Sequence, residues 1–136
     1  MAYRGSVCLI LFHKPGFGLD DACRTLAACG DLCVTPKADG LAQIAAQMCG
    51  GPILTISFQS GRATQQWVAR LGKRTPYAAA LDHCDACFFI HIADLRALLK
   101  DITGLLVVQK TLVEATQGFQ YTLWDDKICS AADLAA

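Results

Sequence analysis

The chain has 136 residues, of which 54% are hydrophobic and 18% charged; this balance excludes intrinsic disorder and suits one folded domain over residues 1–136. Twelve basic and twelve acidic residues give a formal net charge of zero. A neutral chain is no broad polyanion binder, so we do not expect a nucleic-acid partner. Because no apolar run approaches the roughly 20 residues that cross a bilayer, we expect no membrane partner.

The first predicted element is a buried strand over residues 6–13, a continuously apolar run. Its apolar part is too short for a signal-peptide core of about 7–15 residues, so we expect a cytoplasmic protein. Two glycines mark a turn at residues 13–18, and Asp20 and Asp21 then suit the first turn of a helix. The pattern predicts, in chain order, a helix over residues 19–27, a strand over 32–35 ended by Pro36, a short helix over 41–48 and a strand over 53–58.

The second half begins with a predicted helix over residues 62–71, a helical turn over 77–81 and a strand over 87–92. Asp94 then caps a long predicted helix over residues 94–116, whose apolar residues recur at steps of three and four. The alternative is two helices broken at Thr103-Gly104. A last strand follows over residues 119–124, and residues 127–136 are predicted to be a mobile tail.

Strands therefore alternate with helices along the predicted chain. This order is typical of an α/β layered domain. We accordingly expect a single domain with a mixed, largely parallel sheet and a long C-terminal helix followed by a last strand. Gln109 lies on the apolar stripe of that helix, so we expect its amide to be buried with a hydrogen-bond partner.

Eight cysteines occur, most of them inside apolar segments, which favours reduced thiols in a cytosol over disulfides. Cys84 and Cys87 form a C-x-x-C motif, with His91 four residues further on, and are weak candidates for a metal site or a redox pair. Redox motifs of this kind normally open a helix after a strand, whereas this one precedes a strand. We therefore expect no metal and no cofactor, and keep a Cys- or metal-dependent enzyme as an alternative.

The turn at residues 13–18 lies between a strand and a helix, the usual position of a phosphate cradle. Its G-x-G is incomplete for a dinucleotide site, and Asp20 and Asp21 would repel a phosphate. A small-ligand or nucleotide-binding regulatory module remains a second hypothesis. The sequence has no G-x-S-x-G elbow and a single glutamate, so our prediction is that the protein is not an enzyme.

Charge is distributed unevenly along the chain. Residues 40–81 carry four bases and no acid, whereas residues 82–136 carry eight acids and four bases. Separated charges of this kind steer partners. The predicted partner-binding residues are Asp82, Asp85, Asp94, Trp124, Asp125 and Asp126. The alternative basic surface consists of Arg62, Arg70, Lys73 and Arg74.

The C-terminal stretch combines a helix with a central V-Q-x-x-L pattern at residues 108–112, Gly118, and an aromatic strand ending in Trp124-Asp125. In this stretch the chain resembles small bacterial cytosolic immunity proteins of contact-dependent and type VI secretion systems. The resemblance implies a non-enzymatic protein that binds and neutralises one bacterial toxin domain through a charged patch. No functional residue is carried over from it, and a homodimer is left open.

Overall fold

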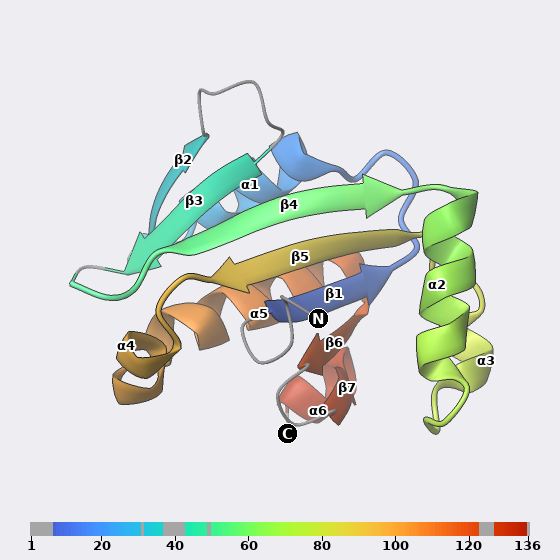
Figure 1. Cartoon of the computed structure of the whole chain (residues 1–136). Helices are drawn as coiled ribbons and strands as arrows, with labels where there is room; N and C mark the ends of the chain where they lie inside the picture. Colours follow the sequence, from blue (N-terminus) through green and yellow to red (C-terminus); the bar gives the residue numbers. More distant parts are fainter. Residues whose placement is uncertain (1–6, 31, 37–42, 49, 123–126, 136) are drawn as a thin grey trace.

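The computed structural model describes residues 7–30, 32–36, 43–48, 50–122 and 127–135. Over these ranges, seven strands form one sheet in the order β2-β3-β4-β5-β1-β6-β7, flanked by six helices (Figure 1). In chain order the elements are β1 (Val7–Phe12), α1 (Leu19–Ala27), β2 (Leu32–Pro36), β3 (Gln43–Met48), β4 (Leu54–Ser60), α2 (Arg62–Gly72), α3 (Ala78–Leu81), β5 (Ala86–Ile92), α4 (Leu95–Lys100), α5 (Thr103–Thr116), β6 (Phe119–Thr122), β7 (Lys127–Ser130) and α6 (Ala131–Ala135).

All neighbouring strands of this sheet run antiparallel, so the prediction of a mixed, largely parallel sheet is wrong. The stretch predicted as a helix over residues 41–48 contains strand β3 instead. Ile44 and Ala46 are buried while Gln43, Ala45 and Gln47 are half-buried, which is the alternation of a strand. Alanine and glutamine favour helices in isolation, but pairing with β2 and β4 on both sides overrides that preference. With β3 in place, β2, β3 and β4 follow one another as antiparallel neighbours.

The predicted long helix over residues 94–116 is also wrong, because α4 ends at Lys100 and α5 begins at Thr103. Asp101 has extended backbone angles, with φ −149° and ψ 95°. Its Oδ1 accepts a hydrogen bond from the backbone N–H of Thr103 over 3.1 Å, which satisfies a donor in the first turn of α5. The two-helix alternative placed the break at Thr103-Gly104. The observed break lies just before these residues, between Lys100 and Thr103. Asp94 does cap α4, since its Oδ1 accepts from the N–H of Ala97 over 3.1 Å.

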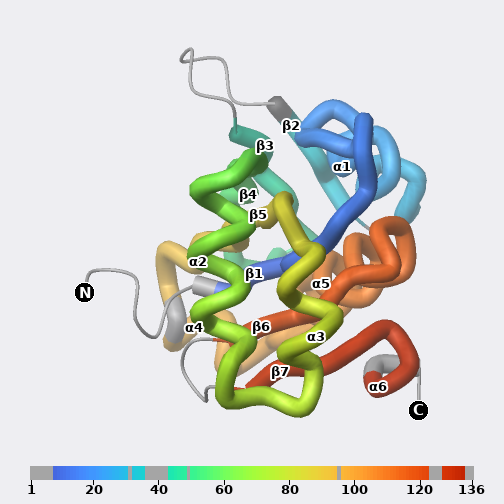
Figure 2. Tube along the Cα trace, turned by 90° about the vertical axis from the view of Figure 1, so that its right-hand side faces the viewer, coloured from blue at the N-terminus to red at the C-terminus, as the bar shows by residue number. Residues whose placement is uncertain are grey.

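Strand β1 lies between β5 and β6 and contributes side chains to both faces of the sheet. Cys8, Ile10 and Phe12 enter a larger core beneath α1 and α5, whereas Leu9 and Leu11 enter a smaller core beneath α2 and α3. Figure 1 shows α1 and α5 behind the sheet, and Figure 2 shows α2 and α3 side by side across its end. Burial on both faces explains why the first strand reads as a continuous apolar run.

The other predicted elements in the described ranges are confirmed within about two residues at each end. Residues 127–135, predicted as a mobile tail, form β7 and α6, and β7 pairs with β6. The helix α5 ends at Gln117, which has a left-handed backbone with φ 52°. Gly118 lies between this residue and the start of β6 at Phe119.

Candidate functional site

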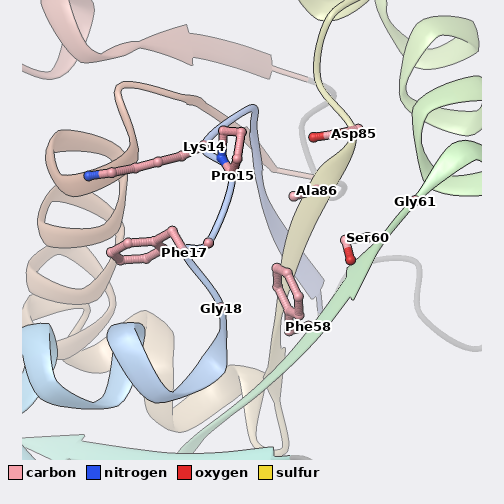
Figure 3. A pocket seen from close by; sticks show the side chains of 10 residues that line it. Lys14, Pro15, Phe17, Gly18, Phe58, Ser60, Gly61, Asp85 and Ala86 are labelled. Carbon is pink, nitrogen blue, oxygen red and sulfur yellow. The ribbon is translucent and has the colours of Figure 1, made fainter.

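One pocket lies where β1, β4 and β5 meet the starts of α1 and α2 (Figure 3). We call it the glycine-loop pocket; its volume is about 450 Å³. Its lining residues are Lys14, Pro15, Gly16, Phe17, Gly18, Phe58, Ser60, Gly61, Asp85 and Ala86. Gly16 and Gly61 have φ values of 85° and 115°, which side chains other than glycine rarely adopt.

The polar groups around this pocket are mostly engaged within the protein. Asp85 Oδ1 lies 3.1 Å from Nδ1 of His13. Lys14 Nζ donates to the backbone oxygen of Ala115 over 2.6 Å and lies 5.0 Å from the centre of the Phe17 ring, so its charge points away from the pocket. Ser60 lies on the opposite wall (Figure 3). The pocket therefore offers aromatic walls, a hydroxyl group and one carboxylate.

The start of α1 is unsuited to a phosphate, as the sequence predicts. The N–H of Gly18 donates to Oδ2 of Asp21 over 2.9 Å, and Arg24 donates to the other oxygen of the same carboxylate. The hydrogen bond from Gly18 is the main cause that holds the pKa of Asp21 below its usual range, with the Arg24 charge adding to it. An ionised carboxylate thus already occupies the end of the helix where an anion would bind.

A second pocket, the basic pocket, has a volume of about 450 Å³ and lies at the C-terminal end of α2. It is lined by Arg70, Leu71, Lys73, Arg74, Thr75 and Tyr121. Three of these residues are cations, and none of the lining residues that the structure describes is acidic. Cations at a helix C-terminus also complement the helix dipole, which is the purely structural explanation for their presence.

Arg62, the fourth member of the predicted basic surface, is the first residue of α2. Arg70 lies eight positions further along the helix, which corresponds to roughly 12 Å. The structure therefore brings together Arg70, Lys73 and Arg74 and leaves Arg62 at the other end of α2.

The loop that carries Lys73 and Arg74 is joined to the last helix. Tyr77 donates its hydroxyl hydrogen bond to Asp133, and its ring lies 5.1 Å from that of Phe119. The hydrogen bond to the carboxylate raises the pKa of Tyr77 and lowers the pKa of Asp133.

Sequence reasoning missed Asp133, although a local signal for it was present. Residues Ser130 and Asp133 have the S-x-x-D spacing of a capping box. The N–H of Ser130 donates to Asp133 Oδ2 over 2.9 Å, and the N–H of Asp133 donates to Ser130 Oγ over 3.3 Å. This reciprocal pair starts α6 and positions the carboxylate that holds Tyr77.

The predicted acidic residues do not form one patch among those that the structure describes. Asp82 ends α3 and Asp85 precedes β5, whereas Asp94 follows the other end of β5. A strand of this length spans roughly 20 Å. Trp124, Asp125 and Asp126 lie outside the described residues.

All seven cysteines that the structure describes have reduced thiols, and Cys8, Cys84 and Cys87 are the buried ones. Burial raises the pKa of the Cys84 thiol to about 11, with a smaller contribution from the charge of Asp85. Burial likewise raises the pKa of Cys87 well above its usual range. These thiols stay protonated at neutral pH, a state that disfavours both nucleophilic attack and metal ligation. Within the described ranges, no three His, Cys, Asp or Glu side chains gather closely enough to hold a metal ion, so Cys84, Cys87 and His91 form no such group.

The chain matches no protein-family model, no curated protein and no solved structure. Among the described residues, no helix combines the length and apolar character needed to span a bilayer. The two pockets and the charges around them are the features of the described residues that bear on function.

Proposed function

We propose that the protein is a non-enzymatic interaction protein that binds an acidic partner protein through the basic pocket. The observation that carries this proposal is the gathering of three exposed cations, Arg70, Lys73 and Arg74, around one concave site. Opposed charges accelerate association and fix the orientation of two proteins. Tyr121, almost fully buried beside these cations, gives the site a rigid aromatic floor.

The acidic residues are the weaker candidates for the same role. Asp82 and Asp85 lie at one end of β5 and Asp94 at the other, so they do not present one continuous surface. Asp85 is already close to His13, and Asp94 already accepts the N–H of Ala97. Binding through these residues would compete with contacts that the protein makes within itself.

The resemblance to bacterial immunity proteins supplies the class of partner. On that basis the partner is a bacterial toxin domain whose surface is acidic where it meets the basic pocket, and the protein neutralises it in the cytoplasm. The reduced thiols of the described cysteines fit a reducing compartment.

Catalysis by a cysteine or a metal is less well supported. The raised pKa values of Cys84 and Cys87 oppose the thiolate form that such chemistry requires. His91 is exposed, whereas Cys87 is completely buried.

Binding of a small ligand in the glycine-loop pocket is a second candidate, favoured by its volume of about 450 Å³ and its aromatic walls, Phe17 and Phe58. Thermal-shift measurements with nucleosides and with small aromatic amines would reveal a ligand, because the pocket offers aromatic walls and a carboxylate. The substitution Ser60→Trp adds bulk at an exposed position on the pocket wall and should abolish any such shift.

The main proposal is tested with the triple variant Arg70→Glu, Lys73→Glu and Arg74→Glu. Immobilised wild-type protein is first used to capture the partner from a lysate of cells in which the protein is naturally produced. The purified partner is then titrated against the wild type and each variant. We expect the triple variant to weaken binding by at least about 30-fold, because removing one partner of a closely opposed charge pair typically costs about 2 kcal/mol or more. The wild-type affinity should also fall as salt is raised from about 50 to 300 mM.

The matched control is Arg96→Glu, Lys100→Glu and Lys110→Glu, which makes the same change in net charge at three other exposed bases. Its affinity for the partner, measured by titration at nanomolar protein concentration, should lie within about three-fold of the wild-type affinity. Equal binding by the basic-pocket variant and the wild type would contradict the proposal and return attention to the acidic residues.

A further inference from the structure

Three large apolar side chains are exposed where α4 passes into α5. Leu99, Ile102 and Leu106 retain 67%, 41% and 51% of their accessible surface. Single exposed apolar residues are common on protein surfaces, but three within one short segment mark an interaction site. We call them the α4–α5 patch.

The backbone places these side chains on the outer side of the two helices. The N–H of Leu106 donates to the oxygen of Ile102 over 3.0 Å, so the two residues are one helical turn apart on the same face. Leu98 and Leu105, one residue away from Leu99 and Leu106, are buried in the larger core. The inner side is therefore already filled, and the patch faces outward.

The start of α5 is held tightly against the sheet. A Cβ atom added at Gly104 would lie 3.0 Å from Cγ of Met48 in β3. Because the helix cannot move inward, the patch cannot be covered by a shift of α5 toward the sheet. Ile53, which is 50% exposed, directly precedes β4. It lies at the end of the sheet where β5 leads into α4, because Leu54 pairs with Ile92.

The charges around the patch balance. Between residues 94 and 114 the chain carries three acids, Asp94, Asp101 and Glu114, and three bases, Arg96, Lys100 and Lys110. On α4, Arg96 lies three positions before Leu99 and therefore on the same face, and the side chain of Lys100 is exposed as well. A surface with equal numbers of both charges does not repel its own copy, unlike the basic pocket, whose described charges have one sign.

We infer that the α4–α5 patch is the contact between two copies of this chain in a two-fold symmetric dimer. In such an interface the same patch meets itself, so the exposed bases of one copy can approach the exposed Glu114 of the other. The apolar side chains form the centre and the charges form the rim, which is the usual arrangement of protein interfaces.

This inference is independent of the proposed function. The helices α2 and α4 lie at opposite ends of β5 (Figure 1), so dimerisation through α4 and α5 leaves the basic pocket accessible. Because only three large apolar side chains form the centre, the interface falls in the small size class, and we expect a dissociation constant on the order of 10 μM.

Sedimentation equilibrium of the purified chain between about 1 and 500 μM tests the inference. The expected mass rises from that of the 14.6 kDa monomer toward twice that value across the range. The double variant Leu99→Asp and Leu106→Asp should raise the dissociation constant at least about 100-fold, since each copy contributes both charges. The control Ala63→Asp and Gln66→Asp adds the same charge at exposed positions of α2 and should dimerise like the wild type.

A second variant keeps the test decisive if the aspartate variant folds poorly. Arg96→Glu with Lys100→Glu makes the rim acidic without changing the apolar centre, so we expect weak dimers at low salt and partial recovery at about 0.5 M salt. A wild-type chain that remains monomeric at 500 μM overturns the inference. So does a dimer that both patch variants leave unchanged.

Discussion

The side-chain amide of Gln109 in α5 donates from Nε2 to Sγ of Cys8 in β1 over 3.0 Å. Both side chains lie inside the larger core, with exposed fractions of 3% and 0%. The expectation that Gln109 faces the core and finds a hydrogen-bond partner is thus confirmed. The contact favours the observed rotation of α5 over the central strand, because it pairs the buried amide with an acceptor in β1.

Removing the sulfur of Cys8 and the amide of Gln109 together should cost less than the sum of the two separate changes. In Cys8→Ala the donor of Gln109 loses its acceptor, so we expect the free energy of unfolding to fall by about 2–3 kcal/mol from the lost contact and the small cavity. The double variant Cys8→Ala with Gln109→Leu should be less destabilised than the sum of the two single variants. Urea unfolding of all four proteins measures the difference, and strictly additive effects would contradict the proposed link.

Gly118 should tolerate no side chain, although its backbone angles are ordinary. An added Cβ would lie 2.4 Å from the backbone oxygen of Leu11 and 2.8 Å from Cβ of Phe12. Gly118→Ala should therefore push β6 away from β1 and destabilise the protein by at least about 2 kcal/mol. Gly30→Ala is the control, because an added Cβ there meets nothing within 4 Å. Similar urea midpoints for the two variants would show that the close approach is unimportant.

The elements that sequence reasoning identified are those in which local pattern and tertiary environment agree. The apolar run at β1 is buried on both faces, and the amphipathic pattern of residues 19–27 matches α1. The segment at residues 43–48 was misread because Ile44 and Met48 have helical spacing as well as the alternation of a strand. Only the neighbouring strands β2 and β4 decide between the two, and their pairing is not visible in a local pattern.

The candidate site was predictable only in part, for the same reason. Lys73 and Arg74 are close to Arg70 in the sequence, so their grouping follows from local spacing. The participation of Tyr121 in the basic pocket depends on the order of the strands, which places β6 beside β1. The separation of Asp85 from Asp94 likewise follows from the single strand β5 between them, and a count of charges along the chain could not reveal it.

Reactivity of the thiols should follow their burial. Cys33 is exposed on the edge strand β2, whereas Cys84 and Cys87 are buried and protonated at neutral pH. We expect iodoacetamide at pH 8 to modify Cys33 at least about 100-fold faster than either buried thiol, because the thiolate is the reacting form. Mass spectrometry of timed samples gives the rate for each site, with urea-unfolded protein as the control. Comparable rates in the folded protein would contradict the burial of this pair.

The raised pKa of Cys84 also predicts how stability changes in alkaline solution. The unfolded thiol releases its proton near its usual pKa of 9.0, whereas the folded thiol keeps it up to about pH 11. Its contribution to folding is therefore complete below pH 9 and is lost progressively as the pH rises from 9 to 11. Cys84→Ala should lose less stability than the wild type over that interval, as measured by urea unfolding at pH 8 and 10.5. Parallel decreases in the two proteins would contradict the shift.

The break between α4 and α5 should depend on the carboxylate of Asp101. Its Oδ1 accepts the N–H of Thr103, and hydrogen bonds from the Thr103 side chain and backbone hold its pKa below the usual 3.8. Because the folded pKa is lowered, the stabilisation is complete above the unfolded value and is lost as the pH falls through the folded one. Asp101→Ala should thus lower the urea midpoint equally at pH 7 and pH 5, and the difference from wild type should shrink below about pH 3.8.

Asp101→Asn separates the hydrogen bond from the charge. Its amide oxygen still accepts the N–H of Thr103, so at pH 7 the urea midpoint of this variant should lie between those of the wild type and Asp101→Ala. It has no carboxyl group to titrate, so its difference from Asp101→Ala should persist at pH 3. There the wild type should move toward Asp101→Asn, because a neutral carboxyl group still accepts through its carbonyl oxygen. Helix content measured by circular dichroism should stay nearly constant in both variants, because Leu98 and Leu105 anchor α4 and α5 separately in the larger core. If instead the wild type kept its full advantage over Asp101→Ala at pH 3, the carboxylate would not be the group that starts α5.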